Sequence, residues 1–255
     1  MSRMKQNSEK FYNGMSKLKI HHFKSLSSTQ DKAKEYTKKG LSNLVVVSEV
    51  QTKSRGRLNR KWVSSKGGLW ISILVKPKNI EKLQYLTFAA AVSVQKSIRK
   101  IAKIDAKIKW PNDVHYKGKK IGGILTEGIF GKENHVIVGI GLNVNQTKFP
   151  SEIKNLATSL KIIAKKSFDM KKLEKNIVKD FFNIFNSCYN NGKFDKILAL
   201  WKDHCDTLDK DVEATTRKGK ISGFVSGVDN DCNLLLKLKT GEIMKIAEGD
   251  IKVRY

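Results

Sequence analysis

Short apolar runs separated by polar turns fill much of the chain, and most of them have the length of a strand. The β-branched runs at 44–50 and 69–75 are the clearest, and strand-like segments also occur at 18–23, 106–110, 121–127 and 135–144. Capping residues and helical spacing of apolar positions predict helices over 28–40, 81–102, 170–190 and 194–204. Strands and helices alternate loosely, which favours an α+β fold with a mixed central sheet flanked by helices.

The pattern changes near residue 208. From there on short strands alternate with turns at 229–231 and 240–241, which is typical of a small β-barrel. Residues 1–16 are polar and aperiodic. We therefore expect a flexible N-terminal tail at 1–16, a main domain at 17–207 and a small C-terminal β-barrel domain at 208–255.

Composition places the chain among globular proteins. With 255 residues, of which 40% are hydrophobic, it can bury a core, and no apolar run approaches the roughly 18 residues of a membrane span. The N-terminus lacks the apolar segment of a secretory signal. The three cysteines are far apart and form no CxxC motif, which fits a reducing compartment. We expect a soluble cytoplasmic protein without a membrane partner.

The charge balance leaves a nucleic-acid-binding protein open as an alternative. Fifty Lys and Arg residues against 24 Asp and Glu residues give a formal net charge of +26, which attracts polyanions. However, the excess is mostly lysine scattered along the whole chain. A nucleic-acid-binding protein also needs a recognition helix or stacking aromatic residues, and Trp62 is the one aromatic residue in the most basic loop.

That basic loop, residues 52–66, is the first candidate for chemistry. It contains six basic residues and no acidic one. Gly56 at its centre lets the backbone pass close to a ligand. Arg55 and Arg57 on either side provide forked donors that match phosphate or carboxylate. A loop of this length and charge predicts an anion-binding function.

Two strand segments indicate room for a ligand. In 119–127, Lys120 places a cation beside Gly122 and Gly123, and glycine in a strand interior often marks the close approach of another group. In 136–145 one face is wholly apolar, which predicts a buried core face. The other face carries Ile137, Gly139, Gly141, Asn143 and Asn145.

A third segment, 109–113, is ambiguous by itself. Pro111 ends a strand, and Asn112 and Asp113 can form a turn, cap a helix or hold a metal ion. The five histidines show no spacing with cysteines or carboxylates that would form a zinc site. We predict no dedicated set of metal ligands.

Taken in order, these segments resemble the biotin protein ligase family. The matching pieces are SSTQ at 27–30, EVQ at 49–51, SRGRLNRKW at 54–62, KWPND at 109–113, KIGGILTE at 120–127 and GIGLNVN at 139–145. The resemblance runs from residue 20 to 255 and implies the class II synthetase-like biotin–lipoate ligase fold with a C-terminal SH3-like β-barrel. It implies the monofunctional type without a DNA-binding domain, because no room for a winged helix-turn-helix precedes residue 20.

The family's reaction has two steps. The biotin carboxylate attacks the α-phosphate of ATP to give biotinyl-5′-AMP and pyrophosphate, and a lysine of a biotin carboxyl carrier protein then attacks this anhydride. The resemblance thus implies a biotin–[acetyl-CoA-carboxylase] ligase with ATP and biotin as substrates and Mg²⁺ as cofactor. The carrier domain of a biotin-dependent carboxylase is the partner, nucleic acid is not expected, and pairing through the central sheet makes a homodimer possible.

Motif by motif, the resemblance also implies roles at the biotin end of the site. Residues that would bind the ureido group and the body of biotin are Ser28, Thr29, Gln30, Gln51, Gly122 and Gly123. Gln30 stands where the family more often has asparagine.

At the phosphate end, the loop Arg55-Gly56-Arg57 would close on the adenylate, with Arg57 near its phosphate. Lys120 would contact the carboxylate and α-phosphate oxygens as the main catalytic charge. Asp113 would be an acid facing the carrier lysine or the metal, and Asn143 an amide near the nucleotide. Ser54 replaces the first glycine of the family's usual Gly-Arg-Gly-Arg.

A lipoate or octanoate ligase of related fold is the nearest alternative. It predicts a loop with glycine and histidine in place of the basic one and no matching terminal barrel. Residues 52–62 argue against it.

Overall fold

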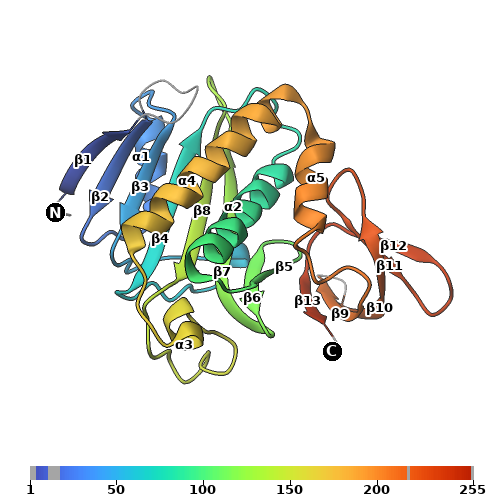
Figure 1. Ribbon diagram of the computed structural model, residues 1–255. Coiled ribbons are helices and arrows are strands. Elements are labelled where there is room, and N and C mark those ends of the chain that lie inside the picture. Colours follow the sequence, from blue (N-terminus) through green and yellow to red (C-terminus); the bar gives the residue numbers. More distant parts are fainter. Residues whose placement is uncertain (1–3, 11–17, 217–218, 254–255) are drawn as a thin grey trace.

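The computed structural model describes residues 4–10, 18–216 and 219–253, and its largest element is an eight-stranded sheet (Figure 1). The strand order is β1-β2-β3-β4-β8-β7-β6-β5. Strands β2 and β3 pair in parallel and the other neighbours antiparallel. The sheet is therefore mixed, which confirms the predicted fold class. The strands are β1 (Met4–Lys10), β2 (Leu18–Phe23), β3 (Leu44–Ser48), β4 (Gly68–Val75), β5 (Lys107–Lys109), β6 (Asp113–Tyr116), β7 (Lys119–Ile129) and β8 (His135–Asn143).

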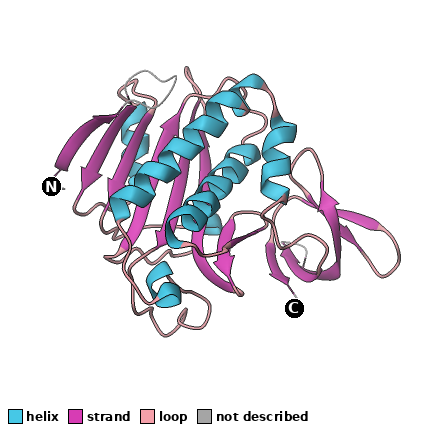
Figure 2. Ribbon diagram, viewed as in Figure 1, coloured by secondary structure: helices cyan, strands magenta, loops and turns pink. Residues whose placement is uncertain are grey.

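Helices lie on both faces of this sheet (Figure 2). α2 (Gln84–Ala102) and α4 (Met170–Ser187) pack against each other across one face, whereas α1 (Thr29–Thr37) contacts β3, β4 and β8 from the other. α3 (Leu160–Ala164) and α5 (Phe194–Lys202) are shorter. Ser28 is the N-cap of α1, since its hydroxyl accepts a hydrogen bond from the Asp31 amide. Within the described ranges no helix is long and apolar enough to cross a membrane.

The core follows the alternation of β8. The even-numbered residues Val136, Val138 and Ile140 belong to the main apolar core together with residues of α2 and α4, as the pattern predicts. Ile137, on the opposite face, belongs to a small separate cluster under α1. The second face is therefore apolar only beneath α1, and the rest of it is left for other groups.

The C-terminal part forms a second, antiparallel sheet of five strands in the order β12-β11-β10-β9-β13. Its strands are β9 (Asp211–Thr216), β10 (Gly219–Val228), β11 (Leu234–Lys237), β12 (Ile243–Ile246) and β13 (Asp250–Val253). Trp110 fastens it to the large sheet, because its indole donates to the carbonyl of Cys232 at 2.9 Å and its amide donates to the hydroxyl of Thr207 at 3.0 Å. A domain boundary at residue 208 stays a prediction.

The sequence missed three elements. Met4–Lys10, part of the expected flexible tail, forms β1 and pairs antiparallel with β2, which the sequence did not predict. Residues 1–3 and 11–16 of that predicted tail lie outside the described residues. An edge strand can form through backbone hydrogen bonds alone, so it needs no apolar pattern. The short elements β6 and α3 were also not predicted.

Candidate active site

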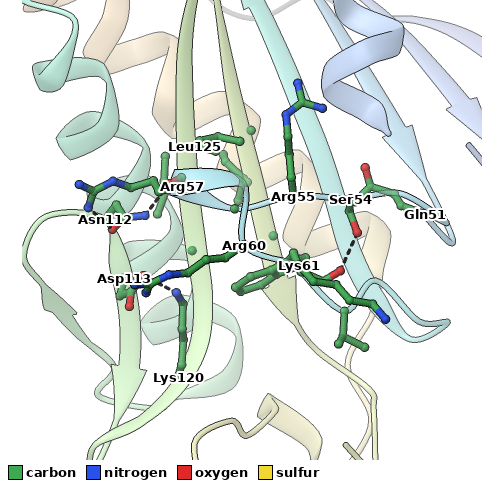
Figure 3. A pocket seen from close by; sticks show the side chains of 18 of the residues that line it. Gln51, Ser54, Arg55, Arg57, Arg60, Lys61, Asn112, Asp113, Lys120 and Leu125 are labelled. Atoms are coloured by element: carbon green, nitrogen blue, oxygen red, sulfur yellow. Dashed lines mark hydrogen bonds and ion pairs between the residues drawn. The ribbon is translucent and has the colours of Figure 1, made fainter. Parts of the chain in front are cut away.

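A cavity of about 410 Å³ opens on the face of the large sheet that carries α1. Its walls are the basic loop, the start of α1, parts of β4, β7 and β8, the segment 149–157 and Asp250 of β13. Figure 3 shows Arg57 and Arg60 of the loop extending toward Asp113 of β6 and Lys120 of β7, whereas Arg55 and Lys61 point away from them. Residues from all six of the matching sequence segments therefore meet in one place.

Glycines on β8 make room for side chains that wall this cavity. A Cβ atom at Gly139 would lie 2.9 Å from the side chain of Gln30, and one at Gly141 would lie 2.7 Å from the indole nitrogen of Trp62. The emptied face predicted from the sequence does border the cavity. Directly above these two glycines, however, protein side chains occupy the space that we expected a ligand to take.

At one end of the cavity a chain of neutral hydrogen bonds joins α1, β4 and the residues after β3. The amide and hydroxyl of Thr29 both donate to the Gln51 side-chain oxygen, at 2.7 and 3.0 Å. The hydroxyl of Ser72, buried in β4, lies 2.8 Å from both the Thr29 hydroxyl and the Gln30 oxygen, and its single proton can be donated to either of them. This end offers neutral donors and acceptors to a ligand, and Ser28 lies next to it.

The basic loop is a closed turn held by its own hydrogen bonds. The Gly56 amide donates to the Arg60 carbonyl at 2.7 Å, and the Ser54 hydroxyl donates to the Trp62 carbonyl at 2.7 Å. Leu58 and Asn59 at the apex both have left-handed backbone angles, with φ of 54° and 55°. Non-glycine residues in this region carry strain, which is common where a loop is shaped for a ligand.

Cations gather at the other end of the cavity. The ammonium of Lys120 lies 2.5 Å from an oxygen of Asp113 and 5.1 Å from the centre of the Trp62 ring. The Arg57 guanidinium donates to the Asn112 side-chain oxygen at 3.1 Å, so it is held by a neutral partner. Between Arg57 and Lys120 there is one carboxylate for two positive charges, which leaves this end able to bind an anion.

Arg55 differs from Arg57 in its partners. It contacts Asp31 of α1 at 2.8 Å and Glu127 of β7 at 3.3 Å. The hydrogen bond to Asp31 raises the pKa of the Arg55 guanidinium above its usual value, although burial opposes this. Figure 3 shows its side chain pointing away from Asp113 and Lys120.

Three further predicted site residues lie in or next to the wall. Asn143 is buried, lines the cavity and donates to the Thr158 carbonyl at 3.1 Å. Gly123 lines the cavity as well, whereas Gly122 does not, because it faces the neighbouring strand: a Cβ there would lie 2.9 Å from the Gly141 carbonyl oxygen. Gly122 therefore serves the packing of β7 against β8.

Sequence reasoning missed several residues of the wall. Ser72 lies buried behind the wall, where it bonds to Thr29 and Gln30, and it was missed because it is hidden in an apolar strand. Asp250 reaches the cavity from the C-terminal sheet and pairs with Arg60 at 2.5 Å, which no local pattern indicates. The sequence also missed an apolar group that follows β8 without regular spacing: Phe149, Ile153, Leu156 and Ala157.

Comparison with known proteins gives consistent matches over nearly the whole chain. A model of the biotin/lipoate A/B protein ligase family matches residues 22–145, and one of the biotin protein ligase C-terminal domain matches residues 207–254. The bifunctional ligase/repressor BirA of Bacillus subtilis is 37% identical over 236 residues, covering 89% of this chain and 72% of that protein. The biotin–[acetyl-CoA-carboxylase] ligase of Mycobacterium tuberculosis is 29% identical over 218 residues, covering 83% of this chain and 79% of that protein.

The solved structures agree. The biotin protein ligase from Aquifex aeolicus in complex with biotin and ATP has a TM-score of 0.82 and 34% sequence identity, and the match covers 92% of this chain and 98% of that one.

Proposed function

Because the chain belongs to the biotin protein ligase family, we propose that it activates biotin with ATP to biotinyl-5′-AMP and transfers the biotinyl group to a lysine of a biotin carboxyl carrier protein. The observation that carries this proposal is the polarity of the cavity, which has a neutral hydrogen-bonding end at Thr29 and Gln51 and a cationic end at Arg57 and Lys120. Biotin has the same polarity, with a neutral ureido group at one end and a carboxylate at the other.

In the first step a biotin carboxylate oxygen forms a bond to the α-phosphorus of ATP, and the bond to the leaving pyrophosphate breaks. Two anions must approach each other, so their repulsion is the main obstacle. Lys120 and Arg57 at the cationic end supply the compensating charge and hold the reacting groups in place. No covalent enzyme intermediate is needed.

In the second step the amine of the carrier lysine attacks the acyl carbon of the adenylate, and AMP leaves. The attacking amine must lose a proton. Asp113, a carboxylate that lines this end of the cavity, is the group that we assign to receive or orient it.

Mg²⁺ fits the cationic end as part of the nucleotide. Among the described residues no three histidine, cysteine, aspartate or glutamate side chains are grouped to hold a metal ion. However, Mg²⁺ at nucleotide sites is commonly held by one or two carboxylates together with phosphate oxygens. Asp113 would be its carboxylate ligand, and the ion would neutralise phosphate charge.

The partners and location follow as parts of the same proposal. An acidic carrier surface suits the net charge of +26. We also propose a cytoplasmic location, where carrier and ligase would meet. We further propose that two chains pair into a homodimer, which light scattering tests directly.

The activity is tested by ATP–pyrophosphate exchange with purified protein and Mg²⁺, in parallel reactions with biotin, lipoate, octanoate or no acid. We expect exchange that requires biotin. Exchange with lipoate or octanoate but not with biotin would assign the chain to the alternative ligase, and the absence of exchange with every acid would contradict the proposal.

A further inference from the structure

We propose that Arg55 is a positioning residue: its two ion pairs, to Asp31 and Glu127, fasten the basic loop over the cavity, so that it does not act by contacting the adenylate. This inference deepens the proposed function and rests on it. It replaces the ligand contact that the family resemblance implies for Arg55.

The first ground is the number and origin of the contacts. One guanidinium nitrogen of Arg55 lies 2.8 Å from Asp31, and the other lies 3.3 Å from both oxygens of Glu127. The two acids come from different elements, the first turn of α1 and the strand β7. Arg55 thus connects the loop to both elements at once, and its charge is already balanced by two carboxylates.

The second ground is that Glu127 belongs to the hydrogen bonds of the cavity as well. Its oxygen accepts from the Gln30 side-chain amide at 2.8 Å, while the Gln30 oxygen accepts from Ser72. The Ser72 hydroxyl also lies 2.8 Å from that of Thr29. A continuous set of contacts therefore runs from the neutral end of the cavity through Glu127 to the loop.

The third ground is the contrast with Arg57 in the same loop. Arg57 has a neutral partner, Asn112, and keeps its net charge for an anion. Arg55 has two acidic partners and points away from Lys120 (Figure 3). Two neighbouring carboxylates would weaken phosphate binding by Arg55, whereas a residue that holds the loop in place needs such partners.

The three residues can be tested by charge-removing substitutions of similar shape: Arg55→Gln, Asp31→Asn and Glu127→Gln. The matched control is Glu35→Gln, which removes an exposed acid from the same helix α1; among the described residues Glu35 pairs with Lys32. Glu127→Gln is the cleanest variant, since its side chain can still accept from Gln30 and it lies outside any helix.

The first readout needs no ligand and no activity. Trypsin cleavage at Arg57, Arg60 and Lys61 reports how often the loop opens. We expect all three variants to raise the cleavage rate about fivefold, which is the size of effect expected for partly exposed ion pairs. The control should leave the rate unchanged. The double variant Arg55→Gln/Glu127→Gln should be no worse than Arg55→Gln alone, because the two residues act as one unit.

The second readout is biotin-dependent pyrophosphate exchange. All three variants should raise KM for biotin and ATP about equally while kcat changes less. If Asp31→Asn and Glu127→Gln leave both cleavage and KM at wild-type values while Arg55→Gln raises KM, then Arg55 contacts substrate and the inference is wrong. If wild-type protein shows no exchange with any acid, the proposed function fails, and the cleavage rates still decide whether Arg55 fastens the loop.

Discussion

One face of the large sheet is packed against α2 and α4 by apolar side chains, whereas the other face carries glycines, amides and cations around a cavity. The two faces belong to the same strands. On β8, Val138 and Ile140 belong to the main core, and Gly139 and Gly141, between and beside them, accommodate Gln30 and Trp62. Because successive residues of a strand point to opposite faces, the same strand contributes to the stable core on one face and to the cavity on the other.

The largest expected effect comes from damaging the packed face. Phe181 of α4 is fully buried and its ring lies 5.6 Å from that of Phe182. Phe181→Ala should lower the free energy of unfolding by about 3–5 kcal/mol, because it leaves a cavity in the core. Urea denaturation followed by circular dichroism measures this. As a control, Phe130→Ala should change it by less than about 0.5 kcal/mol, since that ring is 62% exposed.

The next effect concerns the cavity face. Gly141→Ala would bring a methyl group to within 2.7 Å of the Trp62 indole. Because overpacking costs about 1–3 kcal/mol and the indole belongs to the loop, we expect biotin binding to weaken about tenfold or more. Isothermal titration calorimetry measures the affinity. Gly131→Ala, where a Cβ atom meets nothing within 4 Å, should bind like wild type; equal affinities for both variants would mean that Trp62 is not tied to the site.

A smaller effect is expected at the rim, where the loop meets the C-terminal sheet. Arg60 and Asp250 form an ion pair whose side chains are 62% and 51% exposed. Exposed pairs contribute about 0.2–1 kcal/mol and are screened by salt. Asp250→Asn should therefore lower the melting temperature slightly at low salt and not at 0.5 M salt. A large loss that persists at high salt would show a role beyond the ion pair.

The smallest expected effect is on the pH dependence of stability. It concerns two adjacent histidines on opposite faces of β2. His21 stacks on Tyr36 of α1, whereas His22 bonds to Glu174 of α4. Burial, with the nearby charges of Lys19, His22 and Lys32, lowers the pKa of His21 below its usual 6.5.

As the pH falls below 6.5, the unfolded chain binds a proton at position 21 that the folded chain resists, so the free energy of unfolding decreases. His21→Phe keeps a ring on Tyr36 and removes the titration. Its stability should fall less than that of wild type between pH 7.5 and 5.5, and parallel profiles would refute the assignment.

The sequence predicts the packed face well, because its signal is local. The alternation in β8 and the helical spacing in α4 each lie within one segment and identify residues of the main core. The open face is predictable only in part. Its glycines signal missing bulk, and Arg57 and Lys120 signal charge, but their partners lie far away along the chain.

The sequence alone could not predict these partners. Gln30 fills the space above Gly139, 109 positions later, and Glu127 pairs with Arg55, 72 positions earlier. No spacing rule connects residues so far apart. β1 escaped prediction for another reason, since its pairing rests on backbone hydrogen bonds and not on an apolar pattern.

The most direct test of this account is the exchange rate of Lys120→Ala. If the open face performs adenylation with Lys120 as its main charge, biotin-dependent ATP–pyrophosphate exchange should fall about 10²–10³-fold, while the melting temperature stays close to that of wild type. An unchanged exchange rate in a folded Lys120→Ala protein would contradict the account.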